Sequence, residues 1–93
     1  MSEQQALAEA AKEQGRRHPV TILVNEQPVE VLGPRITGRE IKQAAIDAGL
    51  PIDLGFQLVE EMAHGRTRIV GDTDIVEVRP RSRFLALAPD DNS

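Results

Sequence analysis

The sequence contains no cysteine, no tryptophan and no tyrosine, and it has only two phenylalanines. Without cysteine the chain can form neither a disulfide nor a thiolate metal site, and it has no cysteine nucleophile for catalysis. Two aromatic rings offer few surfaces on which the bases of a single-stranded nucleic acid could stack. A chain without a disulfide framework is typical of the cytoplasm, and we predict that location.

Long apolar runs and an excess of positive charge are also missing. No segment approaches the roughly 18 consecutive apolar residues that a membrane-spanning helix requires, and residues 1–17 lack the apolar core of a signal peptide. The formal net charge of −4 disfavours binding to nucleic acid through its phosphates. We therefore expect partners other than membranes and nucleic acid.

A length of 93 residues allows one small domain. We predict a flexible leader over residues 1–18, a folded domain over 19–88 and a flexible C-terminal tail over 89–93. The leader is rich in Ala, Gln and Glu and has only a weak apolar stripe, which favours a flexible segment over a helix docked on the domain.

Two short segments near the start of the domain have the pattern of strands. In residues 20–24 the apolar side chains of Val20, Ile22 and Val24 alternate to one face, as in a half-buried strand, and residues 29–32 form a second β-rich run. The link NEQP is short and contains Asn and Pro, so the pattern predicts an antiparallel hairpin.

The next segment predicts a helix of about three turns. Thr37 followed by Glu40 forms a capping box, and Ile36 and Ile41 occupy the positions of a hydrophobic staple. Gly49 can adopt the left-handed conformation that ends a helix. A narrow apolar stripe, suited to packing across a sheet, is formed by Ile41, Ala44, Ala45 and Ala48.

Shorter apolar segments follow the helix and predict the remaining strands. They lie at residues 56–59, at 69–70 between two turn-like segments, and at 75–78, after which RPRSR interrupts a strand that resumes at 84–88. The order strand, strand, helix, strand, short strand, strand predicts a two-layer α+β domain. A right-handed crossover would bring the final strand beside the first. This arrangement is the β-grasp, with a mixed sheet of four to five strands and one helix packed across it.

Several motifs also occur in the order found in a known family. They are VN before the hairpin turn, ITGREI at the helix start, FQL in the third strand, then IVEV, and finally RF. Over residues 19–88 the chain resembles the bacterial multiubiquitin-type ubiquitin-like domain. The resemblance implies a ubiquitin-like protein modifier from a bacterial ubiquitination-like operon, and it suggests antiviral defence as the setting.

The resemblance also implies a role for the tail. A conjugated modifier presents its C-terminal carboxylate in a narrow extended segment, which in most ubiquitin-like proteins ends in two glycines. Here the last glycine is Gly71, but DDNS is similar to the tails of bacterial relatives in which a peptidase exposes asparagine. We therefore expect removal of Ser93 to leave Asn92 as the attachment residue. The simpler interpretation is a solvated terminus without chemistry.

The implied partners are a ubiquitin-activating-like enzyme, a conjugating-like enzyme, a processing peptidase and a target protein, and no cofactor is implied. The chemistry belongs to these partners, and the chain itself shows no nucleophile with a base, so we do not expect an enzyme. One alternative is a β-grasp interaction module that is not conjugated. Another is a sulfur carrier, which shares the fold but ordinarily requires two C-terminal glycines.

Two candidate partner-binding surfaces remain. Arg79, Arg81 and Arg83 are spaced by two and could form a basic strip on an extended segment. Such a strip would dock acidic groups of an activating enzyme, discourage edge-to-edge aggregation or, as a third alternative, contact nucleic acid. Val59 follows Leu58 in the predicted strand, so the two side chains point to opposite faces of the sheet, and Val59 could belong to an exposed apolar recognition patch. The alternative for Val59 is an ordinary half-exposed valine.

No set of residues has the spacing of a metal site. The histidines His18 and His64 lie far apart and lack close-spaced partners, so we interpret both as exposed loop residues. The pair Asp72 and Asp74 lacks the other positions of an oxygen-ligand loop and is better explained by a turn. The neighbouring acids at 60 and 61 would point to opposite faces of a strand, which excludes a carboxylate pair for acid–base catalysis.

Overall fold

The computed structural model describes residues 17–89. Most of the predicted leader and the last four residues of the predicted tail lie outside this range. β1 begins at His18, one residue before the predicted domain boundary. The elements of the described part are β1 (His18–Val24), β2 (Gln27–Gly33), β3 (Arg35–Thr37), α2 (Gly38–Asp47), β4 (Gln57–Glu61), the 3-10 helix η1 (Ala63–Gly65), β5 (Thr67–Val70), β6 (Ile75–Glu77) and β7 (Arg83–Leu87).

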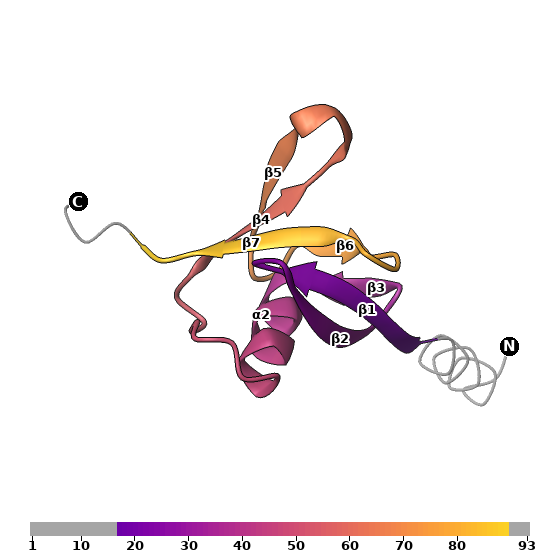
Figure 1. Ribbon diagram of the computed structural model, residues 1–93, viewed down its shortest axis with the longest axis horizontal. Coiled ribbons are helices and arrows are strands. Elements are labelled where there is room, and N and C mark those ends of the chain that lie inside the picture. Colours follow the sequence, from indigo (N-terminus) through magenta and orange to yellow (C-terminus); the bar gives the residue numbers. More distant parts are fainter. Residues whose placement is uncertain (1–16, 90–93) are drawn as a thin grey trace, which may run out of the picture.

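The main sheet has five strands in the order β2-β1-β7-β4-β5 (Figure 1). β1 and β2 form the predicted antiparallel hairpin, and β7 lies beside β1 and parallel to it. β4 runs antiparallel to both β7 and β5. The mixed sheet, with α2 packed across one face, confirms the predicted α+β, ubiquitin-like β-grasp fold.

α2 begins and ends where its local chemistry predicts. The side chain of Thr37 accepts a hydrogen bond from the backbone N–H of Glu40 at 3.2 Å, and the Glu40 carboxylate accepts one from the Thr37 backbone N–H at 3.0 Å. Gly49 has a φ of +96°, and Leu50 donates its N–H back to the Ala45 carbonyl at 3.0 Å. The capping box and the glycine stop are therefore confirmed.

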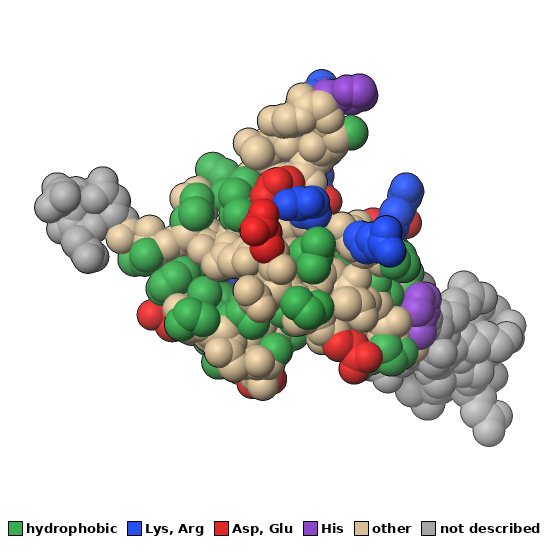
Figure 2. Space-filling view, viewed as in Figure 1, with side chains coloured by type: hydrophobic (Ala, Val, Ile, Leu, Met, Phe, Trp, Pro, Cys, Tyr) green, Lys and Arg blue, Asp and Glu red, His purple; other side chains and the backbone are tan. Residues whose placement is uncertain are grey.

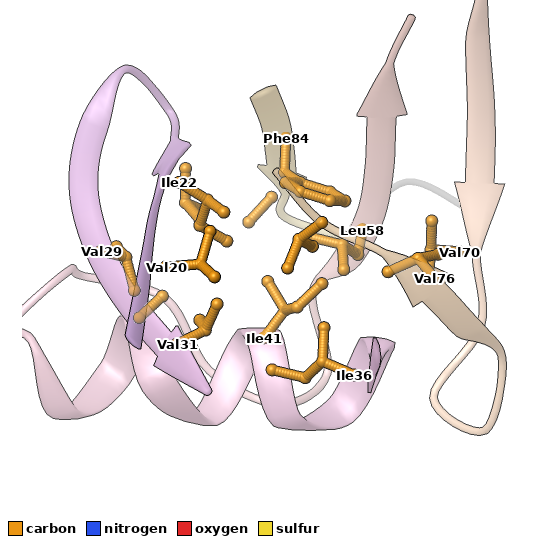
Figure 3. Close-up of a cluster of buried hydrophobic side chains, with 14 residues drawn as sticks. Val20, Ile22, Val29, Val31, Ile36, Ile41, Leu58, Val70, Val76 and Phe84 are labelled. Atoms are coloured by element: carbon orange, nitrogen blue, oxygen red, sulfur yellow. The ribbon is translucent and has the colours of Figure 1, made fainter. Parts of the chain in front are cut away.

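The core lies between the inner face of the sheet and α2 (Figure 3). Alternate residues of each strand point inward, as their period of two predicts. Phe84 of β7 and Ile41 of α2 are among its most deeply buried side chains. The buried hydrophobic residues are Val20, Ile22, Val24, Val29, Val31, Ile36, Ile41, Ala45, Leu58, Val70, Val76, Val78, Phe84 and Ala86.

The structure corrects the expectation of one interrupted strand near the C-terminus. β6 and β7 belong to different sheets, because β6 pairs antiparallel with β3 in a separate two-stranded sheet. A turn separates them: Ser82 donates its N–H to the Arg79 carbonyl at 2.9 Å, and Arg81 has a φ of +72°. β3 was not predicted, because three residues between Pro34 and a helix are too few to show a period.

Candidate functional site

The C-terminal segment leaves the domain from the middle of the sheet. β7 lies between β1 and β4, with Val24 beside Phe84 in the parallel pair and Leu58 beside Ala86 in the antiparallel pair. β1 pairs only with Arg83 and Phe84 at the start of β7, whereas β4 pairs with β7 from Arg83 to Leu87, so the end of β7 is held by β4. Ala88 and Pro89, the last described residues, are exposed.

Asn25 extends the pairing of β7 beyond the end of β1. The backbone turns away here with a φ of +50°, and the Asn25 N–H donates to the Phe84 carbonyl at 2.9 Å. The side-chain oxygen then accepts the Ala86 N–H at 2.9 Å, and the amide donates to the Ala86 carbonyl at 3.2 Å. The side chain thus takes the place of a backbone partner. The sequence pattern places Asn25 at the hairpin turn, and nothing local indicates a bond to a residue 61 positions away.

An apolar row crosses the outer face of the sheet, opposite α2. Val59 pairs with Ile69 on one side and with Leu85 on the other, and Leu87 lies on the same face of β7. Ile69 is 65% exposed and Leu87 46% exposed, whereas Val59 and Leu85 are half-buried. We call these four residues the outer apolar row. They place Val59 within a surface that could bind an apolar partner.

The three candidate arginines do not share one strand. Arg79 and Arg81 belong to the turn before β7, where the Arg79 N–H donates to the Ser82 hydroxyl at 2.8 Å and the Arg81 N–H donates to the Thr21 carbonyl at 2.9 Å. Only Arg83 lies in β7. All three are exposed, so the basic surface follows a turn and one strand residue and is not a straight strip.

Arg83 is partly neutralised by acids on neighbouring elements. Its guanidinium lies 3.4 Å from the Glu26 carboxylate and 3.8 Å from that of Glu61. A second exposed pair joins Arg68 to Glu60 at 2.6 Å across the β4–β5 hairpin. Figure 2 shows acidic and basic groups side by side over the middle of the sheet, with a histidine and a basic group at the hairpin tip. Among these arginines, Arg79 and Arg81 have no such acidic partner within the described residues.

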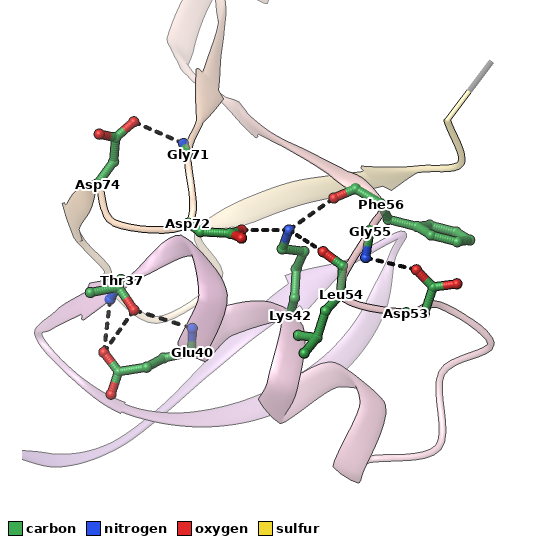
Figure 4. Close-up of polar contacts among 10 residues, drawn as sticks. All are labelled: Thr37, Glu40, Lys42, Asp53, Leu54, Gly55, Phe56, Gly71, Asp72 and Asp74. Atoms are coloured by element: carbon green, nitrogen blue, oxygen red, sulfur yellow. Dashed lines mark hydrogen bonds and ion pairs between the residues drawn. The ribbon is translucent and has the colours of Figure 1, made fainter.

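The loop between β5 and β6 contacts α2 through hydrogen bonds and an ion pair, of which Figure 4 shows the contact between Asp72 and Lys42. The Gly38 N–H donates to the Asp74 carbonyl and the Arg39 N–H to the Asp72 carbonyl, both at 3.1 Å. Asp74 in turn accepts the Gly71 N–H at 2.8 Å, which confirms the predicted turn role of this aspartate. The loop therefore accepts hydrogen bonds from backbone N–H groups at the start of α2 that the capping box does not satisfy.

Lys42 of α2 points into the same junction and is buried. Its ammonium donates to the Leu54 carbonyl at 2.7 Å and the Phe56 carbonyl at 3.0 Å, and it lies 2.6 Å from the Asp72 carboxylate. The hydrogen bond from Lys42 to the Asp72 carboxylate lowers the pKa of Asp72 below its ordinary value. The sequence pattern does not indicate this role of Lys42, because its three partners come from two other segments of the chain.

The described residues contain no cluster of three or more His, Asp or Glu that could hold a metal ion. A hollow of about 270 Å³ between β5 and β6 is smaller than the roughly 300–1,000 Å³ of small-molecule sites. No helix within residues 17–89 is long and apolar enough to cross a membrane. The surface features that remain are the outer apolar row, the turn arginines and the exit of the C-terminal segment.

A hairpin, a helix across the sheet and a C-terminal strand parallel to the first define a ubiquitin-like β-grasp domain. Comparison with known families agrees: the family model described as Multiubiquitin matches residues 20–90, and the chain belongs to this family. No curated protein and no solved structure matched the chain.

Proposed function

We propose that this ubiquitin-like domain is a bacterial protein modifier, or its precursor, that acts through the segment following β7. The observation that carries the proposal is the exit of that segment from the end of β7, which pairs with β4 and is bonded at Ala86 by the Asn25 side chain. A fixed base followed by residues with small side chains suits a carboxylate that must enter another enzyme's active site. Membership of the multiubiquitin family supports the same function.

The proposed chemistry is acyl transfer carried out by partners in the cytoplasm. A processing peptidase removes Ser93, and the carboxylate of Asn92 then attacks the α-phosphate of ATP on an activating enzyme, releasing pyrophosphate. A cysteine thiolate displaces AMP to form a thioester, which passes to a conjugating enzyme. An amine or hydroxyl of the target finally displaces that thiolate. The exposed Arg79 and Arg81 are proposed contacts for acidic groups of the activating enzyme.

Intact mass and peptide mapping after co-expression with the proposed activating enzyme, conjugating enzyme and processing peptidase would test the proposal. We expect loss of Ser93 and linkage of Asn92 to another protein. Deletion of Ser93 alone should remove the need for the peptidase, whereas deletion of both Asn92 and Ser93 should abolish linkage. If every molecule keeps Ser93 and stays unattached while those enzymes are active, the proposed function is wrong.

A second candidate function is an interaction module that is not conjugated. The outer apolar row favours it, because Ile69 and Leu87 are large hydrophobic side chains left exposed on one face. Replacement of Ile69 by Ser should weaken partner capture without unfolding the domain if this face binds a partner. Deletion of residues 90–93 should leave that capture unchanged in an interaction module and remove conjugation in a modifier.

A further inference from the structure

β5 lies at one edge of the five-stranded sheet, and bonds elsewhere in the sheet determine which of its backbone groups point outward. The Phe84 carbonyl accepts a hydrogen bond from Asn25 on the β1 side of β7. Backbone groups of successive residues in a strand point to opposite sides, so Leu85 bonds to Val59 of β4. Val59 therefore has no such group left for β5, and Ile69, its partner there, directs its own N–H and C=O to the open edge.

The open edge of β5 is formed by Thr67 and Ile69. The same alternation directs the backbone groups of Thr67 and Gly71 away from β4. The Gly71 N–H is already taken, because it donates to the Asp74 carboxylate at 2.8 Å. No backbone hydrogen bond joins Thr67 or Ile69 to any element other than β4 within residues 17–89. The β4–β5 hairpin also extends beyond the other strands (Figure 1), so this edge presents the donors and acceptors that a further strand would bind.

The other edge of the sheet, along β2, does not offer such a pattern. The Thr21 carbonyl accepts a hydrogen bond from Arg81 on the β7 side of β1. Ile22, the next residue, therefore bonds to Val29 of β2, and Pro28 faces the outer edge. Proline has no N–H to donate, and prolines on edge strands prevent unwanted pairing. β5 contains no proline, so it is the edge of this sheet that remains open to a partner strand.

A hollow lies beside this edge, between β5 and β6. Ile69 and Ile75 both line it and are 65% and 63% exposed, whereas Val70 and Val76, also in its lining, are buried. An extended segment placed along β5 would cover the two exposed isoleucines with its own side chains. Burial of aliphatic side chains there removes apolar surface from water. The hollow therefore favours aliphatic residues in the segment.

The exposed charges near this edge are mainly basic. Arg68 lines the hollow and its side chain is 53% exposed, whereas that of Glu60, its ion-pair partner, is 15% exposed. Arg66 is exposed and forms no ion pair within residues 17–89. Asp74, the acid in the lining, already accepts the Gly71 N–H. Since the two arginines occupy alternate positions of the chain, acids at alternate positions of a bound segment are complementary to them.

We propose that the open edge of β5 binds an extended segment of a partner protein in which aliphatic and acidic residues alternate. The segment adds a strand beside β5, and its backbone exchanges hydrogen bonds with Thr67 and Ile69. Its aliphatic side chains contact Ile69 and Ile75, while its carboxylates lie near Arg66 and Arg68. This edge is distinct from the segment that follows β7. The inference therefore does not depend on conjugation, and its test requires no activating enzyme.

Hydrogen exchange of single amides, followed by NMR in the free chain, tests the assignment of the edge. After correction for intrinsic rates, the Ile69 N–H should exchange at least about tenfold faster than that of Val70, which bonds to β4. Equal protection of the two amides would overturn the inference. Protection of Ile69 that increases with the concentration of the chain would also overturn it, because a second copy would then occupy the edge.

A capped peptide of alternating aspartate and valine is the probe for binding. At about 1 mM we expect it to slow exchange of the Thr67 and Ile69 amides about fivefold or more. The same peptide with every backbone nitrogen methylated keeps the side chains but cannot donate, so it should have no such effect. A peptide of alternating lysine and valine should act more weakly. No slowing by the first peptide, equal slowing by either of the others, or slowing at Glu30 and Leu32 of β2 instead, would contradict the proposal.

Ile69→Pro tests the edge from the side of the domain. It removes an N–H that β4 does not use, as Pro28 does on β2, so the effect of the peptide on Thr67 should be lost. Ile69→Val keeps the N–H and an aliphatic side chain and should retain the effect. Slow exchange of the Val70 amide in both variants shows that β5 stays paired with β4. Retention of the effect in Ile69→Pro would refute the proposal. If that variant loses the pairing, the methylated peptide decides the question on the unmodified chain.

Discussion

Lys42 shows how a single charged residue can be required in an apolar interior. Lys42 is buried, and its ammonium donates to the backbone carbonyls of Leu54 and Phe56. Replacement by methionine keeps a flexible stem of similar length but removes those donors. We expect Lys42→Met to lower the free energy of unfolding by about 2–4 kcal/mol, measured by urea denaturation followed by circular dichroism.

The neighbouring Gln43 provides a control on the same helix. It is exposed, and its amide donates to Asp47 at 3.0 Å on the helix surface. Gln43→Met should change the free energy of unfolding by less than about 0.5 kcal/mol. A similar small change in Lys42→Met would show that the two carbonyls find other donors, and the role assigned to Lys42 would then be wrong.

Asn25 is the second residue whose role depends on long-range contacts. Asn25→Gly suits the left-handed backbone but removes both side-chain bonds to Ala86, so we expect a loss of about 1–2 kcal/mol. Hydrogen exchange of the Ala86 amide should become faster. Glu26→Gly is the matched control, since Glu26 also has a positive φ, of +66°, and makes only an exposed ion pair. It should leave the Ala86 amide protected, and equal exchange in the two variants would refute the assignment.

At the scale of elements, the start of α2 depends on two side chains that bond each other's backbone. Thr37→Ala removes the hydroxyl that accepts the Glu40 N–H, and we expect it to lower the free energy of unfolding by about 1 kcal/mol. Thr37→Ser keeps the hydroxyl and should cost less than half as much. Urea denaturation of the three proteins gives the comparison. Equal losses in both variants would mean that packing of the threonine methyl, and not the cap, accounts for the effect.

The elements that were predictable are those with a local signature. The β1–β2 hairpin, α2 and its two ends follow from alternation, the capping box and Gly49, all contained in a few consecutive residues. The β3–β6 pair has no such signature, because each strand has three residues and the pairing joins Ile36 to Val76. The sequence pattern also predicts β6 and β7 as one interrupted strand, because apolar residues alternate on both sides of the turn.

At the scale of the whole molecule, the parts of the candidate site that could be predicted are again those with a local sequence pattern. The alternation of side chains along the strand predicts that Val59 lies on the face opposite Leu58. Only the strand order of the sheet brings Ile69 and Leu85 beside it. The spacing of two also predicts a basic strip, whereas the structure places Arg79 and Arg81 in a turn and only Arg83 in a strand. The predicted attachment residue, Asn92, lies outside the described residues and stays a prediction.

Two carboxylates link the stability of the whole domain to pH. Hydrogen bonding from the Thr37 backbone N–H lowers the pKa of Glu40, and the bond from Lys42 lowers that of Asp72. Each group therefore holds its proton less tightly in the folded chain than in the unfolded chain. Their contribution is fully present above the unfolded pKa values, near 4, and it is lost as pH falls through the lower folded values.

Asp72→Asn isolates one part of this dependence, because an amide oxygen can still accept from Lys42 but cannot carry the charge. At neutral pH the variant should be less stable than the unmodified chain, and the difference should shrink as pH falls through the lowered folded pKa of Asp72, because the carboxylate then loses its charge. Urea denaturation between neutral pH and this acid range measures it. Glu30→Gln removes the same charge from an exposed residue of β2 that makes no polar side-chain contact within residues 17–89. Its difference from the unmodified chain should vary little over that range. If both variants follow the same curve, net charge alone governs the acid response, and the bond between Lys42 and Asp72 has no part in it.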